Sequence, residues 1–184
     1  MAYDRTILYS KGYGYANISA SEPVTEQSLF RIASCSKPFT ATAIMLLIQN
    51  NQLQLTDTVF GPHGILDQAQ YQTILDSNVL KITVENLLEH TGGWDDTQQI
   101  DPMFYSTEIS EWANLPPPAM QPTIIEYALS QLYLIHPPGT YYAYSNFGYC
   151  VLGRVIEKIT GTTYEDFIRQ KILIPCGAVE MKLG

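Results

Sequence analysis

An apolar run, PFTATAIMLLI, occupies positions 38–48 of the 184-residue chain. Pro38 stands where the first turn of a helix favours proline, and the run that follows it predicts a helix. Because this helix is apolar on nearly every side, we expect it to be central and buried, with other elements packed around it. A hydrophobic content of 46% is typical of a globular chain that can form such a core.

The rest of the chain predicts a mostly helical α+β fold with an incomplete sheet. Further helices are expected at 83–89, 122–134, 147–160 and 164–172. The aromatic and β-branched segment 6–18, TILYSKGYGYANI, favours one N-terminal strand or a short hairpin. Residues 95–122 have little periodicity and include three consecutive prolines, which predicts a loop bordering a cleft. With no repeat or linker in view, residues 1–184 are expected to form a single domain.

Charge and composition narrow the classes of partner. The chain carries 18 acidic and 10 basic residues, a net charge of -8, which repels phosphate backbones, so we expect no nucleic-acid partner. No run reaches the length of a membrane span, and the N-terminus lacks the pattern of a signal peptide, so the chain as given is expected to be soluble and unexported, hence cytoplasmic. Its three cysteines have no metal-ligand spacing; free, buried thiols are expected, with no metal and no cofactor.

The tetrapeptide Ser34-Cys35-Ser36-Lys37 stands directly before the apolar run. Positions three apart on a helix share one face, so the Ser34 hydroxyl and the Lys37 amine can meet at the helix N-terminus. The positive end of the helix dipole favours an alkoxide there and disfavours an ammonium ion, which suits a nucleophile paired with a base. The spacing alone is weak evidence, because about 0.4 matches per chain of this composition arise by chance.

A Y-x-N tripeptide occurs twice, at Tyr15-Ala16-Asn17 and at Tyr144-Ser145-Asn146. Tyr15 lies on the expected strand ahead of the serine, whereas Tyr144 leads directly into a predicted helix, as a residue on a cleft-lining turn does. We therefore interpret Tyr15 as structural and Tyr144 as functional. His90, in the stretch His90-Thr91-Gly92-Gly93, has no histidine partner at ligand spacing and is interpreted as part of a structural turn.

Four blocks, in this order, resemble the class C β-lactamases and the related penicillin-binding proteins, D-Ala-D-Ala carboxypeptidases and esterases. They are KGYGYAN at 11–17, LFRIASCSKPFTATAIMLLI at 29–48, LLEHTGGW at 87–94 and PPGTYYAYSNFGYCVLGRVIEKITG at 137–161. The resemblance implies a β-lactamase/transpeptidase-like fold and runs from about Asp4 to the last residue. Many proteins of this family are exported, so the compartment stays open.

The resemblance also implies a role for each matching residue. Ser34 would be acylated by a β-lactam, a D-amino peptide or an ester, and Lys37 would take its proton. Tyr144 would act as a second acid/base group, and Asn146 would bind the substrate amide or hold Lys37. Whether Lys37 or Tyr144 is the acylation base stays open, as it does for other S-x-x-K enzymes. The expected partner is a small-molecule or peptide substrate.

Members of this family carry a third motif, K-T-G or H-x-G, whose strand supplies an oxyanion-hole donor. Lys182-Leu183-Gly184 follows the fourth block too closely to be that motif, so we expect a partial domain, truncated at both ends, with impaired activity. An unpaired strand predicts self-association. The alternatives are a non-catalytic β-lactamase-like binding domain and an inactive fragment.

Overall fold

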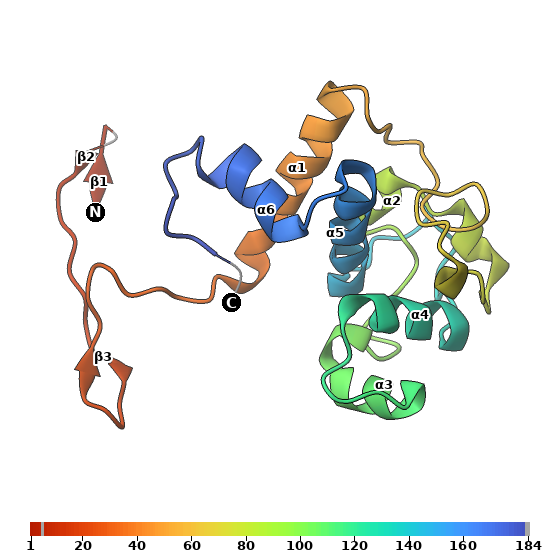
Figure 1. Cartoon of the computed structure of the whole chain (residues 1–184), viewed down its shortest axis with the longest axis horizontal. Helices are drawn as coiled ribbons and strands as arrows, with labels where there is room; N and C mark the ends of the chain where they lie inside the picture. The colour runs from red at the N-terminus through yellow and green to blue at the C-terminus, as the bar shows by residue number, and fades with distance from the viewer. Residues whose placement is uncertain (5, 183–184) are drawn as a thin grey trace. The chain divides into compact units, whose positions relative to one another are not determined.

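The computed structural model describes residues 1–4 and 6–182 (Figure 1). Contacts between residues divide the chain into two units, one ending at Ser34 and the other beginning at Cys35. The prediction of a mostly helical α+β chain with an incomplete sheet is confirmed, because helices fill the second unit and the only sheets among the described residues have two strands each. The expectation of a single domain stays a prediction.

The first unit contains two short antiparallel pairs. Strand β1, Ala2–Tyr3, pairs with β2, Thr6–Ile7, and β3, Tyr15–Asn17, pairs with β4, Glu22–Pro23. The predicted strand at 6–18 thus becomes two separate short strands, and Tyr15 lies on the second of them. No described residue of this unit is buried. Strands of two or three residues with no core beneath them gain little from packing, since isolated two-stranded pairs are marginal in water.

A 3-10 turn, η1, Ala33–Ser36, spans the boundary between the two units and leads into α1, Lys37–Gln49, the first helix of the second unit. Thr40, Ala43, Ile44 and Leu47 of α1 are buried. This spacing defines one helix face, so the expectation of a helix buried on all sides was wrong: Met45, on another side, is 50% exposed. The apolar run alone does not distinguish a helix buried all round from one packed on a single face.

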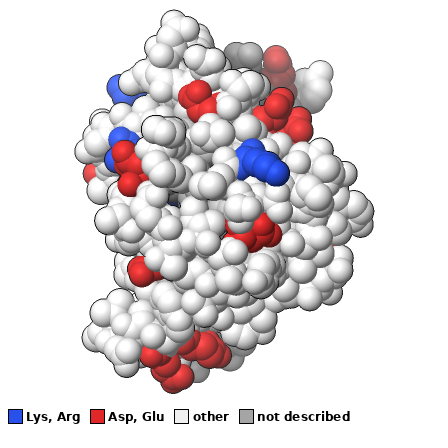
Figure 2. Space-filling view, turned by 90° about the vertical axis from the view of Figure 1, so that its right-hand side faces the viewer, with Lys and Arg blue, Asp and Glu red and all other residues white. Residues whose placement is uncertain are grey.

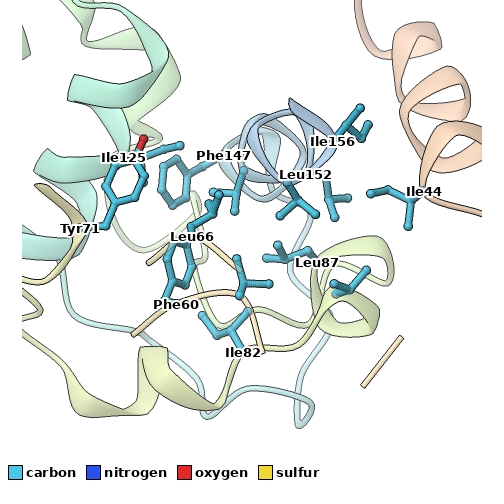
Figure 3. Packing of buried hydrophobic residues seen from close by; sticks show 14 of the residues in the cluster. Ile44, Phe60, Leu66, Tyr71, Ile82, Leu87, Ile125, Phe147, Leu152 and Ile156 are labelled. Carbon is cyan, nitrogen blue, oxygen red and sulfur yellow. The ribbon is translucent and has the colours of Figure 1, made fainter. Parts of the chain in front are cut away.

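Helix α5, Asn146–Thr160, is the element around which the core of the second unit forms. Ser145 caps its N-terminus, and Gly161, at φ 66°, ends it in the left-handed conformation that glycine adopts without strain. The helix contacts α1, α2, Val84–Leu88, and α6, Tyr164–Ile168. Figure 3 shows its Phe147, Leu152 and Ile156 facing side chains of the preceding segments. Those partners are Ile44, Phe60, Leu66, Ile82 and Leu87.

The remaining helices confirm some expectations and correct one. Helix α4, Gln121–Gln131, starts one residue before the expected range 122–134 and ends three residues before the end of that range. The helix predicted at 164–172 is α6 followed by the π-helical turn η5, Arg169–Leu173. The expected loop 95–122 instead contains the 3-10 turn η4, Pro102–Phe104, and helix α3, Ser106–Ala113. This helix of eight residues buries only Ile109 and Ser110, too few positions for a periodic pattern.

Two 3-10 turns complete the second unit: η2, Ala69–Tyr71, and η3, Ser77–Lys81. All three cysteines are free, but the expectation that they are buried was wrong for Cys35 and Cys176, which are exposed. Figure 2 shows acidic side chains scattered over one mostly uncharged face with few basic ones, in keeping with the net charge of -8. No helix in the described part of the chain is long and apolar enough to cross a membrane.

Candidate active site

Lys37 is the first residue of α1, and its ammonium group lies among groups from α5 and the turn before it. Its Nζ donates to Oδ1 of Asn146 at 2.7 Å. The same atom stands 4.6 Å from the centre of the Tyr144 ring and 5.6 Å from that of Tyr149. Aromatic ring faces attract a cation at these distances, so the Asn146 hydrogen bond and the two rings help to hold the lysine head.

The tripeptide Tyr144-Ser145-Asn146 takes its position from the start of α5. The Ser145 side chain accepts the backbone N–H of Gly148 at 3.0 Å, the bond of an N-cap serine. Asn146 is therefore the first helical residue, and Tyr144 lies on the extended chain just before the cap. The structure thus brings Lys37, Tyr144 and Asn146 together, and their catalytic and binding roles stay predictions.

Asp101 fixes which end of the Asn146 amide faces the lysine. Nδ2 of Asn146 donates to Oδ2 of Asp101 at 2.9 Å. A carboxylate only accepts and an ammonium only donates, so the amide points its NH2 group toward Asp101 and its oxygen toward Lys37. The other Asp101 oxygen caps η4 by accepting the N–H of Met103 at 3.0 Å. Sequence reasoning missed Asp101, which lies in the segment expected to be an irregular loop.

His90 contacts the residues on both sides of Tyr144 as well as Tyr144 itself. Its backbone oxygen accepts the N–H of Ala143 at 2.9 Å, and its Nδ1 accepts the N–H of Ser145 at 3.1 Å. Its ring is stacked between Tyr144 and Tyr149, with centroids 4.6 and 4.9 Å away. Burial, and then the charge of Lys37, lower the pKa of His90 below its usual range. The histidine is therefore neutral near pH 7.

Tyr149 was also missed, although it follows Asn146 by one helical turn and so shares its face of α5. Its hydroxyl donates to the backbone oxygen of Leu88 at 3.1 Å, which ties α5 to the end of α2. Burial raises the pKa of the Tyr149 hydroxyl, so that group stays protonated and remains a donor. The spacing from Asn146 is the sequence signal that points to it.

An open hollow of about 570 Å³ lies next to these residues. Its lining comes from one segment of the second unit, residues 96–101 with Phe104 and Tyr105. Asp101 belongs both to this lining and to the hydrogen-bonded chain that leads through Asn146 to Lys37. Phe104 is 76% exposed and gives the hollow an apolar border.

The turn after His90 is held by Asp95, a buried carboxylate. Asp95 accepts from the Thr97 hydroxyl at 2.6 Å, from the Gln98 amide at 2.8 Å and from His136 Nε2 at 3.0 Å. The hydrogen bond from Thr97, followed by that from His136, holds the pKa of this carboxyl well below its usual range. The Gly93 carbonyl accepts the N–H groups of Ile135 and His136, which joins the same turn to the segment before Tyr144.

Ser34 lies on η1, which runs directly into α1. Ala33 before it has a φ of 45°, a left-handed conformation that is uncommon for alanine. The pairing of Ser34 with Lys37 stays a prediction. Among the described residues, no group of three or more His, Cys, Asp or Glu side chains is placed to hold a metal ion.

The chain is similar to a family model and to known proteins. The family model described as Beta-lactamase matches residues 1–184. A penicillin-binding protein of Bacillus subtilis (strain 168) is 32% identical over 178 residues, which are 96% of this chain and 35% of that protein. The chain thus spans about a third of the length of this curated relative.

Two solved structures show the same fold and cover a similar share. The octameric penicillin-binding protein homologue from Pyrococcus abyssi superposes with a TM-score of 0.68 at 30% identity, over 92% of this chain and 36% of that one. The D-amino acid amidase from Ochrobactrum anthropi SV3 gives a TM-score of 0.64 at 28% identity, over 89% and 40%. The β-lactamase/transpeptidase-like fold expected from the sequence is confirmed.

Proposed function

Since the chain belongs to the beta-lactamase family, we propose that it is a serine hydrolase or acyltransferase that forms an acyl-enzyme on Ser34. The observation that carries the proposal is the contact of Lys37 with Asn146 and with the Tyr144 ring, at the start of the helix that Ser34 precedes. Three groups that the family resemblance singles out in the sequence thus meet at one place in the fold. Fold likeness by itself does not assign an activity, but a site with these groups supports one.

In the proposed reaction the Ser34 hydroxyl attacks a carbonyl carbon, and its proton passes to a deprotonated base, either the neutral amine form of Lys37 or the phenolate form of Tyr144. The tetrahedral intermediate expels the leaving group, which takes up that proton, and an ester on Ser34 remains. Water then hydrolyses the ester, or another acceptor takes the acyl group. Asn146 orients Lys37 during these steps and donates to or accepts from the substrate amide.

The similar proteins suggest several classes of substrate for this chain. Penicillin-binding proteins and a D-amino acid amidase are among the similar proteins, so β-lactams, D-amino peptides or amides, and simple esters are the candidate acyl donors. The rate is a separate proposal. In this family a strand with a third motif, K-T-G or H-x-G, supplies an oxyanion-hole donor, and loss of one such donor lowers turnover by about two to three orders of magnitude.

The test uses two probes on the chain as it stands, a fluorescent penicillin and an activated phenyl ester. Labelling or ester hydrolysis that is present in the native protein and lost in Ser34→Ala supports the proposal. Saturable binding of the penicillin that survives Ser34→Ala without turnover would instead identify a non-catalytic binding domain. Absence of both binding and labelling with a folded protein would mark a fragment without its own activity.

We also propose that the chain associates with a second copy through its first unit. Ile7, Leu8 and Phe30 of that unit are 73%, 62% and 68% exposed, and among the described residues each of its strands pairs with one other strand. Exposed apolar surface and unpaired strand edges favour association. The octameric state named for the Pyrococcus abyssi homologue shows that assembly occurs in this family.

A further inference from the structure

His90 makes three contacts with Tyr144 and the residues on either side of it. The backbone oxygen of His90 accepts from Ala143, Nδ1 of His90 accepts from Ser145, and the imidazole stacks on the Tyr144 ring. The two N–H groups belong to the residues on either side of Tyr144, so His90 holds the backbone of this turn by two hydrogen bonds. Loss of the hydrogen bond to Nδ1 removes one of them.

We propose that neutral His90, with its proton on Nε2, is a positioning residue that aims Tyr144 at Lys37, and that acylation of Ser34 requires this form. The proposal rests on the acyl transfer proposed above. The tautomer follows from the bonding, because a backbone N–H only donates and Nδ1 must therefore be the acceptor. His90 touches no substrate in this account and acts through Tyr144.

The surroundings of His90 oppose its protonation. The titratable groups that face it are Lys37 from α1, Tyr142 and Tyr144 from the turn before α5, and Tyr149 from α5. A proton on Nδ1 would place a donor against the N–H of Ser145. It would also put a second positive charge beside Lys37. Acid therefore breaks the bond that holds the turn, and the acylation rate should fall with it.

The backbone of His90 determines which variants are informative. Its φ is 58°, a left-handed conformation that asparagine and glycine tolerate better than other residues. In His90→Asn the side-chain amide oxygen takes the place of Nδ1 as acceptor and does not titrate. His90→Gly removes both the acceptor and the ring, whereas His90→Phe keeps a ring without an acceptor. If the phenylalanine variant does not fold, the asparagine and glycine pair still decides the question.

The kinetic test follows the rate of Ser34 acylation by the activated ester between pH 5 and 9. We expect His90→Asn to stay within about threefold of the native rate above pH 7.5 and to lose the decline on the acid side. His90→Gly and His90→Phe should fall by about tenfold, the effect of one hydrogen bond. The control His63→Asn changes an exposed histidine and should leave the profile unchanged. The proposal would be overturned if the asparagine and glycine variants lost the same fraction of the acylation rate and both kept the native decline of the rate at low pH.

A second readout separates this proposal from the proposed function. Nitrogen-15 shifts of the imidazole report the tautomer without any substrate. We expect His90 to show an unprotonated Nδ1 and to titrate below the usual range of a histidine. A native protein that forms no adduct, yet shows this tautomer, refutes the acyl-transfer function and leaves the hydrogen bond intact. A protonated Nδ1 at pH 7.5 refutes the positioning role even if the protein is active.

Discussion

The amide oxygen of Asn146 lies 2.7 Å from the Nζ atom of Lys37. These residues are far apart in sequence, and the contact joins the first residue of α1 to the first residue of α5. Two helix starts thus meet at one point, where the Tyr144 ring also faces the ammonium group. A hydrogen bond to a charged group contributes about 1.5–3 kcal/mol, so this contact is a sensitive place to perturb the site.

Removing the amide should slow acylation strongly. We expect Asn146→Ala to lower the rate of Ser34 labelling by about ten- to a hundredfold, because Lys37 loses its charged hydrogen bond. Asn146→Asp should also be slow, since its carboxylate would face Asp101. The matched rescue combines Asn146→Asp with Asp101→Asn, so that the amide at 101 donates and the carboxylate at 146 still accepts from Lys37. A double variant no faster than Asn146→Asp would contradict the amide orientation described for this chain.

Gly93 should tolerate a side chain much less well than Gly161. A Cβ on Gly93, at φ 104°, would lie 2.3 Å from the backbone oxygen of His136, whereas one on Gly161, at φ 66°, meets nothing within 4 Å. We expect Gly93→Ala to lower the free energy of unfolding by about 3 kcal/mol and Gly161→Ala by about 1 kcal/mol. Urea unfolding followed by circular dichroism measures both. Similar losses at the two sites would show that the turn has room to shift.

Acid should weaken the fold through Asp95. Its pKa is lower in the folded protein than in the unfolded chain, so the unfolded state binds more protons as the pH falls. The stabilisation is fully present above the unfolded pKa, about 3.9, and is lost as the pH drops below that value toward the folded pKa. We expect the free energy of unfolding to fall more steeply below pH 4 in the native protein than in Asp95→Asn. Parallel curves would exclude Asp95 as the cause.

The three thiols should differ in reactivity. Cys35 and Cys176 are exposed, while burial raises the pKa of Cys150 to about 12. A thiolate is the reactive form, so a disulfide reagent at pH 8 should modify two thiols in the native protein and the third only after unfolding. Cys150→Ser should leave the native count at two. Three rapid reactions in the folded protein would show that the Cys150 environment is open.

Self-association is tested by changing the exposed apolar side chains of the first unit. We expect the native chain to sediment as an oligomer at micromolar concentration and the double variant Ile7→Lys with Leu8→Lys to shift toward the monomer. Met45→Lys, an exposed apolar position of the second unit, is the matched control and should not change the sedimentation. A monomeric native chain at high concentration would contradict the proposal.

The sequence predicted those parts of the molecule that leave a periodic or motif signal. Helix α5 combines a serine cap, an amphipathic run and a closing glycine, so its extent and the place of Asn146 at its start could be expected. Helix α3 could not, because it buries only two residues between proline-containing segments. The contacts of Asp101 and His90 depend on which segments lie together in space, which spacing along the chain does not encode.

The central claim is that Ser34 carries the acyl group, and its exposed neighbour Cys35 is the residue most easily confused with it. The most direct measurement is peptide mapping by mass spectrometry after the activated ester or the penicillin has reacted with the native chain, with Ser34→Ala and with Cys35→Ala. We predict an adduct on Ser34 in the native chain and in Cys35→Ala, and none in Ser34→Ala. An adduct on Cys35 alone, or one that persists in Ser34→Ala, would contradict the account.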